Sequence, residues 1–185
     1  TVTGNNNVSI GESTLRFITS GSYNTALGSK ALQQNTAASN NTAVGYQAAY
    51  SNTTGSGNTA FGFQAFQDNT TGTNNTAIGY EANANNTTGN YNVSLGLQTL
   101  LNNTTAERNT AVGYQAMYSS QTSRYNTAIG YHSGYSQTGG ERNVSMGHTS
   151  LKYSTTGASN VALGNDALFD NTTGSYNVAV GQSAL

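Results

Sequence analysis

One five-residue pattern recurs through the chain at a fixed interval of 17 residues. The pattern is Asn, then Thr or Val, then Ala or Ser, then a large apolar residue, then Gly, as in residues 75–79. An unbroken spacing of this kind is typical of a solenoid, in which each repeat is one turn stacked on the last. We therefore predict a single repeat array over residues 1–185, with eleven units that begin at Asn7, Asn24, Asn41, Asn58, Asn75, Asn92, Asn109, Asn126, Asn143, Asn160 and Asn177.

The alternation inside each unit predicts short β-strands. We number the Asn as position 1, so that position 2 is Thr or Val and position 4 is large and apolar. Because side chains alternate along a strand, we expect positions 2 and 4 to point into the coil and the small residue of position 3 to point outward. Positions 6 to 9 predict a second short strand, with the small residue of position 8 also outward. The expected fold is an all-β parallel solenoid of eleven turns.

Gly occupies position 5 in every unit, which predicts a corner with a positive φ angle or a backbone contact too close for a side chain. Stretches such as residues 52–55, Asn-Thr-Thr-Gly, predict turns, and the Asn of position 1 predicts a ladder of stacked side-chain amides. The expected structural corner consists of Gly11, Gly28, Gly45, Gly62, Gly79, Gly96, Gly113, Gly130, Gly147, Gly164 and Gly181.

Composition narrows the classes of function. Only 7% of the residues are charged and the net charge is −1, so we expect no nucleic-acid partner. The chain contains no Cys, which removes disulfides and thiolate chemistry, and no apolar run reaches the roughly 20 residues of a membrane span. We expect no contact between this segment and a membrane.

The ionisable residues give no sign of a catalytic centre. The carboxylates are scattered over several positions of the repeat, and the two histidines, His132 and His148, occupy neighbouring positions in adjacent turns. A metal site would need further ligands that the nearby sequence does not supply. We therefore expect no enzyme, no catalytic or metal-binding residues and no cofactor.

Aromatic residues recur at position 6 and form a candidate binding face, Tyr46, Tyr80, Tyr114 and Tyr131, which could contact a glycan or another host-surface ligand. Alternatively, these rings pack against one another or between chains. Paired Thr residues, as at 53/54 and 70/71, would form regular ranks on a flat face, so an ice-binding solenoid is a further alternative.

A thin coil sends few large apolar side chains inward, so we expect stability to depend on other copies of the chain. Small outward residues would allow close lateral packing, and end-to-end stacking is a second mode of association. Neither end of the sequence resembles the polar cap that usually closes a solenoid. We therefore expect the array to be an excerpt of a longer fibre protein.

The repeats resemble the YadA-like head repeats of trimeric autotransporter adhesins. Residues 160–164, Asn-Val-Ala-Leu-Gly, with Ala167, and residues 177–181, Asn-Val-Ala-Val-Gly, with Ala184, carry this resemblance. Residues 41–48 also resemble repeats of phage tail fibres and of large surface proteins with a fibre-maturation chaperone. The resemblance implies a left-handed β-roll, a homotrimer and a structural, adhesive role in an extracellular fibre at a cell surface or on a virion. A phage tail-fibre shaft or receptor-binding section is the alternative.

Two departures refine this expectation. The head repeats of that family commonly vary in length, whereas the spacing here is constant, which favours a shaft or filament over an irregular binding head. The usual Val of the motif is mostly Thr in this chain. Flanking domains would distinguish the two origins, because an adhesin carries a membrane-anchor barrel and a phage fibre carries a virion-attachment domain.

Overall fold

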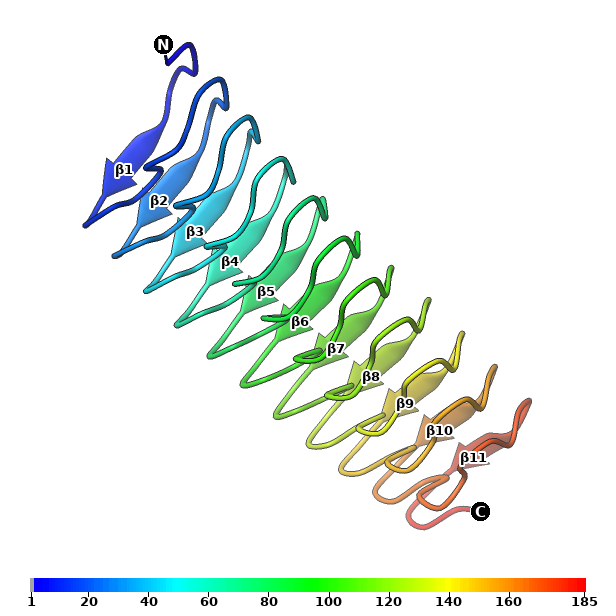
Figure 1. Ribbon diagram of the computed structural model, residues 1–185. Helices are drawn as coiled ribbons and strands as arrows, with labels where there is room; N and C mark the ends of the chain where they lie inside the picture. The colour runs from blue at the N-terminus through cyan, green and yellow to red at the C-terminus, as the bar shows by residue number, and fades with distance from the viewer. Residues whose placement is uncertain (1) are drawn as a thin grey trace.

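In the computed structural model, which describes residues 2–185, the chain forms a rod of stacked coils with its two termini at opposite ends (Figure 1). Each unit contributes one three-residue strand, and the strands form a single parallel sheet in the order of the sequence. Paired residues are 17 positions apart, as with Thr76 and Val93. The predicted all-β parallel solenoid is therefore confirmed. The strands are β1 (Val8–Ile10), β2 (Thr25–Leu27), β3 (Thr42–Val44), β4 (Thr59–Phe61), β5 (Thr76–Ile78), β6 (Val93–Leu95), β7 (Thr110–Val112), β8 (Thr127–Ile129), β9 (Val144–Met146), β10 (Val161–Leu163) and β11 (Val178–Val180).

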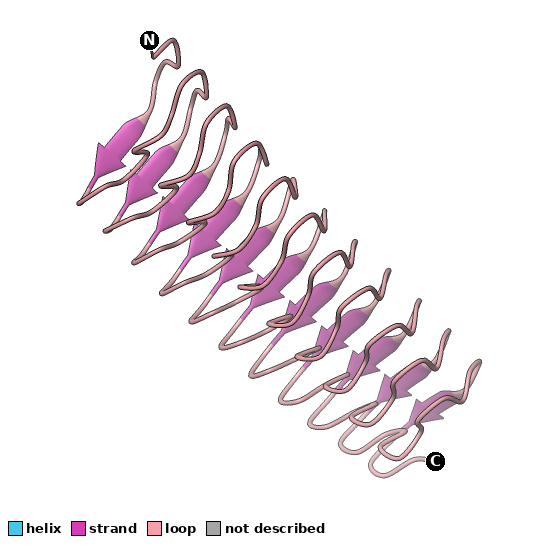
Figure 2. Ribbon diagram, in the orientation of Figure 1, coloured by secondary structure: helices cyan, strands magenta, loops and turns pink. Residues whose placement is uncertain are grey.

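The sheet occupies one side of the rod, and loops and turns form the rest of each coil (Figure 2). At about 4.8 Å between neighbouring strands, the ten steps from β1 to β11 span about 48 Å. Residues 2–185 contain no helix that could cross a membrane.

The expected second strand at positions 6 to 9 is wrong, because the backbone there is coiled rather than extended. Residues at positions 7 and 9 have left-handed φ angles, for example +54° at Gln47 and +50° at Ala49. A strand requires negative φ values throughout. The peptide groups nevertheless bond between turns, since the N–H of Ala49 donates to the carbonyl of Ala65 at 2.9 Å.

The orientation expected for the strand is also wrong. Ala77, at position 3, is completely buried, whereas its neighbours Thr76 and Ile78 are only half-buried. The same pattern holds in the other internal turns, so positions 2 and 4 face outward and position 3 faces the interior. Small residues at position 8, such as Ala48 and Ala65, are likewise buried. The small columns expected to admit a neighbouring chain therefore lie inside the coil.

The interior combines small residues with one column of larger apolar side chains. That column is position 9, where Leu32, Phe66, Leu100 and Met117 are fully buried. Their bulk fills the coil opposite position 3, which explains why only Ala or Ser occupies the inward side of the strand.

The predicted Asn ladder is confirmed and is buried. The side-chain amide of Asn41 donates to Oδ1 of Asn24 at 3.2 Å and to the carbonyl of Gly55 at 3.0 Å. The Oδ1 atom of Asn24 also accepts the backbone N–H of Asn41 at 3.0 Å. A second ladder runs along position 12, where Asn69 donates to Oδ1 of Asn52 at 2.6 Å. These bonds between turns satisfy polar groups that would otherwise be costly to bury.

The glycines of position 5 have φ angles between +121° and +140°. At Gly79, which has a φ of +136°, an added Cβ would overlap the carbonyl oxygen of Gly96 in the next turn. The corner therefore requires Gly both for its φ angle and for the close approach of successive turns.

Candidate functional surfaces

The aromatic residues of position 6 form two stacks along the rod. Tyr46 and Phe63 have ring centroids 5.4 Å apart, and Phe63 and Tyr80 are 5.1 Å apart with an angle of 7° between their planes. Tyr114 and Tyr131 form the second stack at 5.2 Å and 9°. The sequence places Leu97 between the stacks at the same position of the repeat.

This stacking limits which parts of the four predicted tyrosines could contact a ligand. The four predicted tyrosines are half-exposed, but each contributes to a stack whose ring faces cover one another. A sugar ring that stacks on tyrosine needs a free ring face. Between stacked rings, only the ring edges and hydroxyl groups remain available to a ligand.

A column of polar side chains accompanies the rings at position 7. Gln64 donates to Oε1 of Gln47 at 2.9 Å, and Gln115 donates to Oε1 of Gln98 at 2.7 Å. His132 continues the column through Nε2, which lies 2.8 Å from Oε1 of Gln115. The recurrence of Gln at one position of the repeat was the signal in the sequence that could have predicted this ladder.

Both histidines contact one tyrosine, Tyr131. The ring of Tyr131 is 4.0 Å from that of His132 and stacks on His148 at 5.0 Å. His132 also contacts Tyr114 and Tyr135, and its buried Nδ1 has no hydrogen-bond partner within residues 2–185. Over that same range, no three His, Asp or Glu side chains gather where they could hold a metal ion.

The environment of His132 lowers its pKa. Burial is the largest cause, followed by the positive charges of Lys152 and His148. The folded protein therefore binds this proton less readily than the unfolded chain does. The stabilising contribution is complete above the ordinary histidine pKa of about 6.5 and is lost as the pH falls through the lower pKa of the folded state.

We expect the rod to be less stable near pH 5 than near pH 7.5, and we expect His132→Gln to reduce this difference. The new amide can replace the imidazole in its hydrogen bond to Gln115, as elsewhere in the column. Urea unfolding midpoints of both proteins at the two pH values test this expectation. Burial raises the pKa of Asp68, so this residue makes the rod more stable as the pH falls, opposite to His132. Because both proteins contain Asp68, the difference between their pH dependences isolates the effect of His132. An identical pH dependence in both would contradict the assignment to His132.

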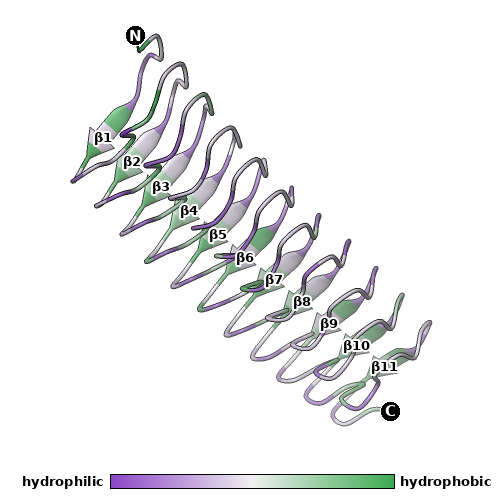
Figure 3. Ribbon diagram, viewed as in Figure 1, coloured by the Kyte–Doolittle hydropathy of each residue, from purple (hydrophilic) through white to green (hydrophobic). Residues whose placement is uncertain are grey.

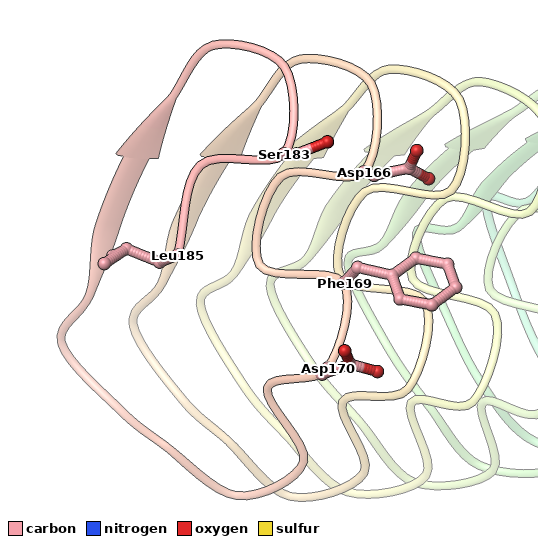
Figure 4. A pocket seen from close by; sticks show the side chains of 5 residues that line it. All are labelled: Asp166, Phe169, Asp170, Ser183 and Leu185. Carbon is pink, nitrogen blue, oxygen red and sulfur yellow. The ribbon is translucent and has the colours of Figure 1, made fainter.

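Two of the carboxylates line a hollow of about 430 Å³ beside the last turn (Figure 4). Figure 4 shows Phe169 between Asp166 and Asp170, so the carboxylates do not converge. Asp166 already accepts hydrogen bonds from the hydroxyl of Thr149 and, at 2.7 Å, from the amide of Asn165. Both oxygens of the Asp166 carboxylate are therefore engaged in hydrogen bonds within the protein.

The paired threonines do not form two equivalent ranks. The first Thr of a pair donates its hydroxyl to a carbonyl of the next turn, as from Thr53 to Thr70 at 2.9 Å and from Thr70 to Thr87 at 3.0 Å. The second Thr, represented by Thr54 and Thr71, is exposed. Only one hydroxyl of each pair is therefore free to contact water or ice.

The outward side of the sheet presents a continuous row of apolar side chains at position 4. The outward positions 2 and 4 recur in register over eleven strands, and Leu27, Phe61, Leu95 and Met146 are each more than two-fifths exposed. The hydrophobic colour in Figure 3 recurs at the C-terminal ends of successive strands. We call the outward side chains of positions 2 and 4 in β1–β11 the sheet face. Contiguous apolar surfaces of this kind commonly mark interaction sites.

Together, these features define a parallel β-solenoid repeat protein that is built on buried Asn ladders and has an apolar sheet face. Comparisons with protein-family models, with curated proteins and with solved structures find no match.

Proposed function

We propose that this chain is a structural and adhesive section of an extracellular fibre, at a cell surface or on a virion, and that it associates through its sheet face. The observation that carries the proposal is the outward position of the apolar residues at position 4. They form one continuous row from Ile10 in β1 to Val180 in β11. A second copy would remove this row from water, which is favourable by about 25 cal/mol for each Å² of apolar surface buried.

The number of copies follows from the resemblance to YadA-like heads, which favours a homotrimer and a left-handed coil. Three rods with their sheet faces toward a common axis would leave the Tyr stacks and the loops available to outside ligands. Constant repeat length suits a shaft, because every turn then presents the same outline to its neighbours.

The oligomeric mass tests the proposal. Sedimentation equilibrium should give three times the 19.1 kDa mass of one chain. Ile78→Lys places a charge on the sheet face and should shift the protein toward the monomer, because burial of an unpaired charge is costly. Thr71→Lys adds the same charge at an exposed loop position and should leave the mass unchanged. A wild-type protein that stays monomeric at micromolar concentration would refute association through this face.

Ice binding is a second candidate, favoured by one observation on the same face. Thr25, Thr42, Thr59 and Thr76 occupy position 2 of four consecutive strands and point outward in register. Bulky neighbours such as Phe61 make the face less flat than a regular Thr array. Thermal hysteresis and ice-crystal shaping by a monomeric rod would favour this candidate, and their absence would eliminate it.

A further inference from the structure

A second exposed row runs along the corner that precedes the strands. It occupies the last position of the repeat, position 17, and consists of Tyr91, Arg108, Tyr125 and Arg142, which we call the corner row. All four have left-handed φ angles, between +56° and +60°. Residues other than Gly and Asn adopt this backbone conformation at a cost in free energy.

The earlier turns show the residues that this backbone accommodates most easily. Position 17 is Asn40, Gly57 and Asn74 in three consecutive turns before the corner row begins. The larger side chains that follow do not enter the core, since Tyr91 is 53% exposed and Tyr125 is 46% exposed. The left-handed φ angle recurs at position 17 in every turn, so the fold sets this backbone, and the residue type decides what the corner displays.

Contacts within the corner row hold its side chains in place. The guanidinium of Arg108 lies over the rings of Tyr91 and Tyr125, at 5.6 and 5.4 Å from their centroids, and its Nη1 donates to the hydroxyl of Tyr125 at 2.9 Å. The guanidinium of Arg142 also lies over the Tyr125 ring, 5.7 Å from its centroid. A ligand would therefore meet alternating rings and cations that are already ordered.

Basic residues are concentrated at this corner. Arg108, Arg124 and Arg142 are half of the six basic residues in the sequence, and they occupy three successive turns. Glu107 and Glu141 lie 3.6 and 3.4 Å from the guanidinium groups that follow them. The pair of Arg142 and Glu141 is the more exposed of the two, and exposed pairs contribute little to stability, so a ligand carboxylate can compete with Glu141 for Arg142.

We propose that the corner row binds a linear acidic polysaccharide that lies along the rod. Arg108 and Arg142 are two turns apart, about 9.6 Å, so a repeating polymer could place successive carboxylates against them. Guanidinium groups bind carboxylates through paired hydrogen bonds, and Tyr125 between them and Tyr91 before them offer hydroxyl groups and ring edges to sugar hydroxyls. This inference extends the proposed adhesive function, and it assigns a ligand class to residues outside the Tyr stacks.

Polygalacturonate is a suitable probe, because its methyl ester has the same backbone without the charges. The triple variant Arg108→Gln, Arg124→Gln and Arg142→Gln should bind polygalacturonate at least about tenfold more weakly than the wild type. The control variant Arg16→Gln, Lys30→Gln and Lys152→Gln removes the same three charges elsewhere and should change affinity by less than about twofold. Arg142→Gln alone, at a highly exposed side chain, should weaken binding by about threefold.

Calorimetric titration measures the affinity of the wild type and the three variants for polygalacturonate. Circular dichroism shows whether each protein is folded. Equal losses in the two triple variants would overturn the proposal, because net charge alone would explain them. Equal binding of the methyl ester, or no binding of polygalacturonate to the wild type, would also overturn it. Tighter binding of poly-glutamate would assign the row to an acidic protein segment instead.

The mass of each sample separates this proposal from the proposed fibre function. A trimer that does not bind polygalacturonate would refute the corner row alone. A monomer that binds it with the expected variant effects would support the corner row and refute association through the sheet face.

Discussion

Gly79→Val is expected to destabilise the rod by about 4 kcal/mol or more, which is among the largest effects that a single substitution produces. Two physical causes add. The φ angle of +136° is one that β-branched residues strongly disfavour. The new side chain would also overlap the backbone of the next turn, where the carbonyl carbon of Gly96 is only 2.7 Å from the Cβ position. Because these are backbone atoms, they cannot rotate away as a flexible side chain would.

Gly139→Val is the matched control. No atom lies within 4 Å of the Cβ position at Gly139, and its φ angle is outside the left-handed region. We expect this variant to change stability by no more than about 0.5 kcal/mol. Urea unfolding of both variants and the wild type measures the difference. Similar midpoints for the two variants would show that the corner glycines are not the constraint that their geometry indicates.

Asn75→Ala should destabilise the rod by about 2 to 4 kcal/mol, because it breaks the buried ladder at three points. The Asn75 amide donates to the carbonyl of Gly89 at 2.9 Å and to Oδ1 of Asn58 at 3.2 Å. Its Oδ1 accepts the backbone N–H of Asn92 at 2.9 Å. The substitution removes the acceptor for this buried N–H and opens a small cavity.

Asn102→Ala provides the comparison for the ladder. Asn102 is half-buried, and its Oδ1 accepts one hydrogen bond from Asn85 at 3.3 Å. Its loss should cost less than about 1 kcal/mol, since water can replace the bond. Denaturant midpoints should therefore separate the two variants clearly. If Asn75→Ala unfolds at the same concentration as Asn102→Ala, the buried ladder does not stabilise the rod as we infer.

Much of the candidate surface could not be predicted from the sequence. The repeat identified the tyrosines of position 6 as a row and left open whether they bind a ligand or pack against one another, and only the structure shows that Tyr46 and Tyr80 belong to one stack with Phe63 between them. The corner row was hidden for a different reason. Its left-handed backbone is usually associated with Gly or Asn, and Tyr91 and Arg108 give no local sign of it.

The sequence by itself determined the period, the strand of positions 2 to 4, the Gly corner and the Asn ladder, although it also predicted a second strand at positions 6 to 9, where the structure has left-handed turns. A repeat of constant length makes every turn equivalent, so each position of the repeat becomes a column in a parallel, in-register stack. Gly79 and Asn75 illustrate this, because their chemical requirements recur in every copy and can be inferred from the column alone.

Only the tertiary structure decided which side of each strand faces the interior. The alternation along Thr76, Ala77 and Ile78 is compatible with burial of Ala77 or with burial of Thr76 and Ile78. A period of two defines two opposite faces of a strand but does not say which face is buried. The choice depends on the space across the coil, which the left-handed turns at positions 7 and 9 and the inward side chains of position 9 make narrow. Ala fits that space and Ile does not, so the larger apolar side chains lie outside, on the face through which we propose that the rods associate.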